Sequence, residues 1–128
     1  MARFSSFEEI NAWRKAYEIT LDVYRTTADG EFVKDYGLKD QIRRASVSMM
    51  ANIAEGHGRR SNSEFANFLN IARGSAAEVQ SHLHVALGLN YIEQSQFDRI
   101  YLGAEEVSKM TLALARYLRQ QSSNSEAS

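Results

Sequence analysis

The chain has 128 residues, 44% of them hydrophobic, and its 15 Lys and Arg against 16 Asp and Glu leave a formal net charge of -1. This size and content predict one domain with one core, and the near-neutral charge excludes a surface that attracts polyanions over its whole extent. Cysteine is absent, which excludes disulfides and thiolate metal sites. No apolar run resembles a signal peptide or approaches the roughly 18 residues of a membrane span. We therefore expect a soluble, cytoplasmic protein with no membrane contact.

Long helices are the expected secondary structure, because proline, the residue that helix interiors exclude most strongly, is also absent. Three serines are each followed three residues later by an acid, the spacing of a capping box at a helix start. These pairs are Ser6 with Glu9, Ser61 with Glu64, and Ser95 with Asp98. Asp35 is a candidate cap for a further helix, which we place near Leu38.

Four residues that tolerate left-handed or turn geometry follow the apolar stretches and are candidate helix ends: Gly30, Gly56, Gly58 and Asn90. The sequence thus predicts helices over 6–28, 38–56, 62–90 and 96–121. They form a single domain over residues 1–121, and a disordered polar tail covers 122–128. Each helix carries one apolar stripe, and that over 62–90 alternates steps of four and three. Short connections between amphipathic helices predict an all-α, antiparallel up-and-down four-helix bundle.

Two helices carry a second face that packing within one bundle does not need. In the helix over 38–56, three apolar residues widen the apolar arc to roughly 200°: Val47, Met50 and Ala54. In the helix over 62–90, a line of mostly small residues lies opposite the seam: Asn70, Gly74, Ala77, Ser81 and Gly88. Glycine within a helix costs about 1 kcal/mol relative to alanine. We interpret both faces as a subunit interface, with tolerance of the glycines on a wet surface as the alternative.

The search for catalytic or metal-binding patterns favours neither an enzyme nor a metalloprotein. No Glu-x-x-His pair of a di-metal bundle occurs, and Glu78 with His82 predicts an ordinary ion pair better than a zinc site. His57 lies between two glycines and is interpreted as a solvated residue at a helix end rather than a general base. No phosphate-binding glycine loop or nucleophile elbow is present. We expect no catalytic residues, no cofactor and no metal.

Positive charge is concentrated over residues 39–73, where six Lys and Arg face three acids for a net of +3. The candidate nucleic-acid patch consists of Arg43, Arg44, Arg59, Arg60 and Arg73. Ion pairs within one helix are the alternative, because Asp40 lies four residues before Arg44. Arg44, Ser48 and Glu55 also share one strip of their helix, which we expect to lie between helices or subunits.

The segment over residues 38–86 resembles the four-helix bundle proteins also called 23S rRNA intervening-sequence proteins. The resemblance rests on "QIRRA" at 41–45, "NIAEG" at 52–56 and "ARGS" at 72–75, with Ile10 and Trp13 matching the family's opening pattern. Its signature residues here are Asn52, Glu55, Gly56, Gly74, Ser75 and Glu78. The match extends over nearly the whole chain, up to about residue 120.

This resemblance implies a small bacterial cytosolic protein that assembles into a ring-like homopentamer and has no established activity. It also implies a distant kinship with a basic pentameric accessory protein of diversity-generating retroelements, which binds nucleic acid. Our first hypothesis is therefore a non-enzymatic oligomeric scaffold or interaction protein. The alternative is an accessory protein that binds RNA or DNA through the arginine patch.

Overall fold

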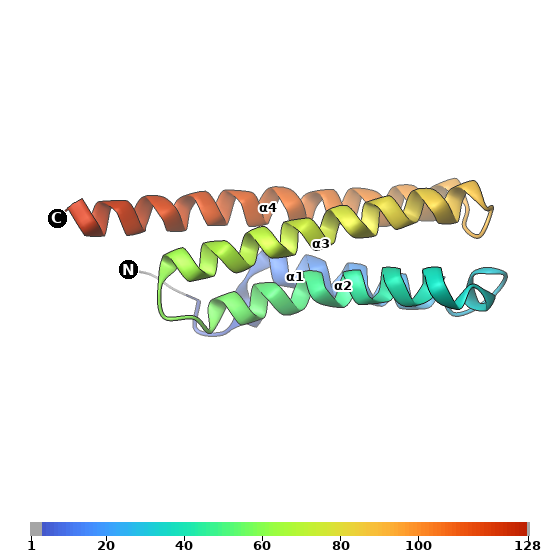
Figure 1. Cartoon of the computed structure of the whole chain (residues 1–128), viewed down its shortest axis with the longest axis horizontal. Helices are drawn as coiled ribbons and strands as arrows, with labels where there is room; N and C mark the ends of the chain where they lie inside the picture. The colour runs from blue at the N-terminus through green and yellow to red at the C-terminus, as the bar shows by residue number, and fades with distance from the viewer. Residues whose placement is uncertain (1–3, 128) are drawn as a thin grey trace.

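The computed structural model describes residues 4–127, with side chains up to residue 122. Its long helices are α1 (Asn11–Thr26), α2 (Tyr36–His57), α3 (Asn62–Gly88) and α4 (Gln94–Ala127), with short 3-10 turns at Phe7–Glu9 and Phe32–Lys34. Each helix packs against its neighbour in sequence, and α4 returns to pack on α1 (Figure 1). Residues 4–127 contain no strand. The predicted all-α up-and-down four-helix bundle is confirmed.

Two of the predicted helix caps are present. The Ser61 hydroxyl accepts the backbone N–H of Glu64 at 3.1 Å and begins α3. The Asp35 carboxylate accepts the backbone N–H of Leu38 at 3.1 Å and begins α2. The same carboxylate accepts a hydrogen bond from the Tyr91 hydroxyl at 2.9 Å, which raises the pKa of Tyr91. Asp35 therefore joins the start of α2 to the connection between α3 and α4.

The other two capping boxes were wrong. Ser6 precedes only a 3-10 turn and makes no side-chain cap, and α1 begins at Asn11 after Ile10. Ser95 lies inside α4, whose start is closed instead by the Gln96 side chain, which accepts the Glu93 N–H at 2.8 Å. The serine-to-acid spacing alone is therefore a weak predictor of a helix start, because a neighbouring side chain can supply the same hydrogen bond.

The helix ends follow the predicted turn residues in part. Gly30 and Asn90 have φ angles of 65° and 61°, the left-handed geometry expected of them. Gly58 ends α2 with a φ of -78°, so its freedom is not used for a left-handed turn. α4 continues through Ala127, beyond the end expected at 121. The boundary between domain and tail at 121 stays a prediction, and residue 128 lies outside the described residues.

The core contains the α3 stripe predicted from the sequence, whereas α1 buries Ala16, Ile19 and Val23 and leaves Tyr17 and Tyr24 exposed. The α3 seam residues Phe65, Leu69, Ala72, Ala76, Val79, Leu83 and Ala86 are all fully buried. Polar contacts fix the register of α1 against its neighbours: the Thr20 hydroxyl donates to the Ser46 carbonyl at 3.0 Å. Arg99 of α4 donates twice to the Asp22 carboxylate, at 2.6 and 2.8 Å, which raises the pKa of Arg99. The bundle is thus aligned by a few specific polar contacts around an apolar interior.

Close approach of α2 and α3 depends on Gly56. A Cβ atom at this position would lie 2.8 Å from Phe68 Cβ and 2.9 Å from Phe65 Cδ1. Both distances are shorter than van der Waals contact, and Phe68 Cβ is fixed directly to the α3 backbone. Glycine is therefore required at 56 for α2 to reach its position on α3.

Replacing Gly56 with alanine is expected to lower the free energy of unfolding by about 1–3 kcal/mol, because the added methyl group overpacks the contact with α3. Gly37→Ala is the matched control in the same helix, since its Cβ would meet only Asp35 Oδ1 at 3.8 Å. That variant is expected to be stabilised by up to about 1 kcal/mol through helix propensity. Urea unfolding followed by circular dichroism measures both; equal stabilities for the two variants would contradict the close-packing account.

Candidate functional site

Arg43 stabilises the end of α1. Its Nε donates to the Thr27 hydroxyl at 2.7 Å, and Nη2 donates to the Tyr24 carbonyl at 3.3 Å. Its guanidinium carbon lies 4.4 Å from the centre of the Tyr24 ring. Carbonyls in the last turn of a helix lack partners within the helix and carry partial negative charge, which a cation compensates. Arg43 is therefore occupied within the fold.

Arg44 of α2 and Arg59, two residues beyond its end, are both paired with acids of α2. Arg44 Nε lies 2.8 Å from Asp40 Oδ2, which confirms the ion pair inferred from their spacing. Arg59 Nη2 lies 2.9 Å from Glu55 Oε1, and its guanidinium also covers the Phe68 ring at 4.6 Å. Exposed pairs of this kind contribute only about 0–1 kcal/mol each, but they reduce the free positive charge on this surface.

Arg60 and Arg73 complete the predicted patch, and they lie apart. Arg60 is exposed in the connection after α2. Arg73 belongs to α3, where its Nη1 donates to Asn70 Oδ1 at 3.4 Å. Its Nε is buried without an acceptor among the described residues. The structure thus distributes the five predicted arginines over several surfaces, and their binding to nucleic acid stays a prediction.

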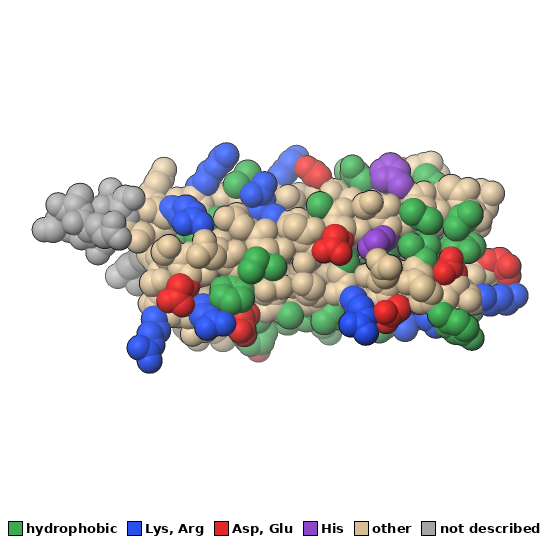
Figure 2. All heavy atoms as spheres, viewed as in Figure 1, with side chains coloured by type: hydrophobic (Ala, Val, Ile, Leu, Met, Phe, Trp, Pro, Cys, Tyr) green, Lys and Arg blue, Asp and Glu red, His purple; other side chains and the backbone are tan. Residues whose placement is uncertain are grey.

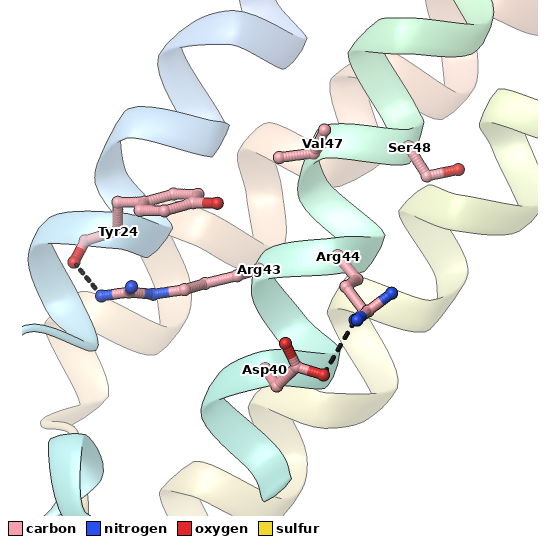
Figure 3. A pocket seen from close by; sticks show the side chains of 6 residues that line it. All are labelled: Tyr24, Asp40, Arg43, Arg44, Val47 and Ser48. Atoms are coloured by element: carbon pink, nitrogen blue, oxygen red, sulfur yellow. Dashed lines mark hydrogen bonds and ion pairs between the residues drawn. The ribbon is translucent and has the colours of Figure 1, made fainter. Parts of the chain in front are cut away.

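A shallow hollow lies on the outer surface of α2, lined by Tyr24, Asp40, Arg43, Arg44, Val47 and Ser48 (Figure 3). Figure 3 shows Arg43 extending from α2 toward Tyr24 on α1, and Arg44 extending away from α1 with Asp40 beside it. Apart from the Tyr24 phenol, the hollow has one hydroxyl, that of Ser48. The Ser48 hydroxyl is hydrogen-bonded to the Ser75 hydroxyl at 2.8 Å rather than to a base. The hollow therefore offers charged and polar contacts but no activated nucleophile.

A polar seam crosses the contact between α2 and α3. The Ser48 and Ser75 hydroxyls share a hydrogen bond, and Asn52 Nδ2 donates to the Ser48 carbonyl at 2.9 Å and to its hydroxyl at 3.0 Å. Of the strip predicted to lie between helices or subunits, Ser48 lies between helices, whereas Arg44 and Glu55 are exposed. Three signature residues, Asn52, Gly56 and Ser75, thus act in positioning α2 on α3. Periodicity gave no signal for this network, because the pairing depends on the register of the two helices.

The predicted interface residues occupy two surfaces of the single chain. Asn70, Gly74, Ala77, Ser81 and Gly88 are all exposed along the outer side of α3. On α2, Val47 is exposed, whereas Met50 and Ala54 are half-buried. Met50 lies one turn after Ser46, which contacts α1, so the α2 residues turn toward α1. The largest continuous line is therefore the one on α3.

The histidines differ from their sequence interpretation. His57 is not a solvated loop residue: it lies in the last turn of α2, half-buried, and its Nε2 donates to the Phe4 carbonyl at 2.9 Å. It joins the N-terminal segment to the end of α2. Glu78 is exposed and forms no ion pair with His82, whose Nε2 is buried without a partner in the described region. Within that region, no three metal-ligating side chains gather.

The geometry defines a four-helix bundle with a glycine-closed, serine-bridged contact between α2 and α3. Residues 8–113 match the family described as 23S rRNA-intervening sequence protein, and the chain belongs to this family. It is similar to a crystal structure of a protein of unknown function from the S23 ribosomal protein family of Bacteroides thetaiotaomicron, with 26% identity and a TM-score of 0.75. The alignment covers 81% of this chain and 97% of that one.

No curated protein matches the chain. In residues 4–127, none of the helices combines the length and apolar character that crossing a bilayer requires. The family and the structural neighbour leave the biochemical activity undefined.

Removing the Arg43 side chain is expected to destabilise the fold, whereas removing that of Arg44 is not. Arg43→Gln leaves the Tyr24 carbonyl and the Thr27 hydroxyl without their charged donor, so the free energy of unfolding should fall by about 1–2 kcal/mol. Arg44→Gln, its neighbour, loses only an exposed pair, so the change should stay within about 0.5 kcal/mol. Urea denaturation measures both, and equal effects would contradict the structural role of Arg43.

Proposed function

We propose that this chain acts as a non-enzymatic scaffold in the cytoplasm, assembled from copies of itself through the outer side of α3. Five copies are the number that the family resemblance favours. The observation that carries the proposal is Gly74, a glycine in the interior of α3 that no contact among the described residues explains.

Gly74 has open space where its side chain would be. A Cβ atom there would meet no atom within 4 Å, in contrast to Gly56. Glycine in a helix interior costs about 1 kcal/mol relative to alanine, and the single chain gains nothing in return. Close approach of another backbone is the usual gain at such a position. Gly88 supports this less strongly, because it is the last residue of α3.

Aliphatic side chains flank the line of small residues on α3. Ile71, Val85 and Leu89 are 51%, 48% and 52% exposed. Figure 1 shows α3 and α2 nearest the viewer, and Figure 2 shows Lys, Arg, Asp and Glu gathered mainly along the edges of this side, with an acidic side chain also over the middle of α3. An apolar centre with a charged rim is the usual composition of a subunit interface. Each Å² of apolar surface covered there contributes about 25 cal/mol.

Substitution of Gly74 by glutamine is expected to break the assembly while preserving the fold. The single chain has room for the side chain, and glutamine favours the helix by roughly 0.7 kcal/mol over glycine. Light scattering should give the wild type a multiple of its 14.5 kDa chain mass, five-fold for a pentamer, and the variant 14.5 kDa. Ala113→Gln, at an exposed position on α4, is the matched control and should retain the wild-type mass.

Two results would contradict the proposal. One is a wild-type protein that is monomeric at micromolar concentration. The other is a folded Gly74→Gln protein of unchanged oligomeric mass, which would place the interface away from this side of α3.

A further inference from the structure

Four cations form a row along the outer contact between α3 and α4. We name Arg73, Lys109, Arg116 and Arg119 the α3–α4 cation row. Arg119 Nη2 donates to Asn67 Oδ1 of α3 at 2.8 Å, and Gln80 Nε2 donates to Glu105 Oε1 of α4 at 2.9 Å. Because the two helices are antiparallel, these two contacts fix their register.

That register places Arg73 between Lys109 and Arg116. Arg73 lies about midway between Asn67 and Gln80, so it is level with the turn of α4 near residue 112. It also lies two turns before Gln80 and therefore on the same side of α3, facing α4. Lys109 and Arg116 are likewise two turns apart and both exposed. Figure 2 shows several Lys and Arg side chains over α4 and the first half of α3.

Acids are sparse around the row, and the nearest ones along α4, Glu105 and Glu106, lie one turn before Lys109. Neither residues 65–77 nor residues 107–125 contain an Asp or Glu. The acids closest along α4, Glu105 and Glu106, contact Gln80 and Lys15. Among the described side chains, no ion pair involves any member of the row, whereas Arg44, Arg59 and Arg99 are all paired. The buried Arg73 Nε also lacks an acceptor in the described region, so the row carries positive charge that no ion pair of the described side chains offsets.

We propose that the α3–α4 cation row binds the phosphate backbone of double-stranded nucleic acid without reading its sequence. From Lys109 to Arg119 the helix rises about 15 Å, and a duplex strand presents a phosphate about every 3.4 Å along its axis. Guanidinium groups match phosphate oxygens in a two-pronged geometry. The amides of Asn67 and Asn70 lie beside the arginines and supply neutral donors for phosphate or sugar.

A duplex fits better than a single strand, because single-strand binding relies on stacked aromatic side chains. The exposed tyrosines lie elsewhere: Tyr17 and Tyr24 on α1, and Tyr36 at the start of α2. Tyr117 is on α4 but one turn from Leu114, which lines a hollow on the α1 side.

Of the five arginines predicted from the sequence to bind nucleic acid, only Arg73 belongs to this row. Arg43, Arg44 and Arg59 instead contact partners within the fold. The row borders the proposed self-association surface and shares Asn70 with it.

The test compares two double variants of the full chain that lose the same charge. Arg116→Gln/Arg119→Gln removes half of the row, and Arg44→Gln/Arg59→Gln removes two paired arginines; glutamine preserves helix propensity in both. Fluorescence anisotropy with a short labelled RNA duplex and a DNA duplex, over a range of salt concentrations, measures binding. The row variant should bind about tenfold more weakly at low salt, with a log–log salt slope reduced by about 2. The paired-arginine variant should stay close to wild type.

Further arms identify the ligand and separate this proposal from self-association. Arg116→Lys/Arg119→Lys keeps the charge and should keep the salt slope, and light scattering should show the wild-type mass for every variant. Equal binding to the RNA and DNA duplexes supports recognition of the phosphate backbone. A preference for one of them shows which nucleic acid is the ligand. Absence of wild-type binding at low salt, equal loss in the two double variants, tighter binding to a single strand, or equal binding to polyglutamate would each overturn the proposal.

Discussion

The arrangement of this bundle depends on how closely α2 approaches α3. Gly56 lets the end of α2 rest against the Cβ of Phe68 and the ring of Phe65, and the Ser48 to Ser75 hydrogen bond fixes the two helices further along. This partly buried hydrogen bond opposes a shift in register, because sliding would take the Ser75 hydroxyl away from its partner on α2. With α2 fixed in this way, α3 retains its other flank for α4 and its outer side for solvent or a partner.

The same helix register also decides which partner each arginine contacts. On α2, neighbours in sequence have different tasks: Arg43 turns to the end of α1, while Arg44 stays at the surface with Asp40. A step of about 100° per residue is enough to send adjacent side chains to different partners. On α3 and α4, Arg73, Lys109, Arg116 and Arg119 form no ion pair among the described side chains, so their charge remains available. A chain with a net charge of -1 can therefore carry one markedly basic strip.

Two neighbouring surfaces follow from this division, with different physical properties. The outer side of α3 carries small residues flanked by aliphatic side chains, and contacts there gain mainly from the burial of apolar surface. The contact between α3 and α4 is cationic, and contacts there weaken as salt rises. Repetition of a subunit around a closed assembly would repeat the cationic strip once per copy, which raises the effective affinity for a long polyanion.

The sequence by itself determined the fold class, the four helices, the α3 seam and the caps at Asp35 and Ser61, because periodicity and local capping depend only on near neighbours. It also carried the family resemblance. Only the tertiary structure decided that Arg43 closes α1, that His57 binds Phe4, and that Arg73 lies level with Lys109 and Arg116. Those pairings join residues far apart in the chain, and they depend on a helix register that composition and spacing do not specify. An acid-free run over 107–125 was the one signal of the cation row, and it became meaningful once α3 lay beside it.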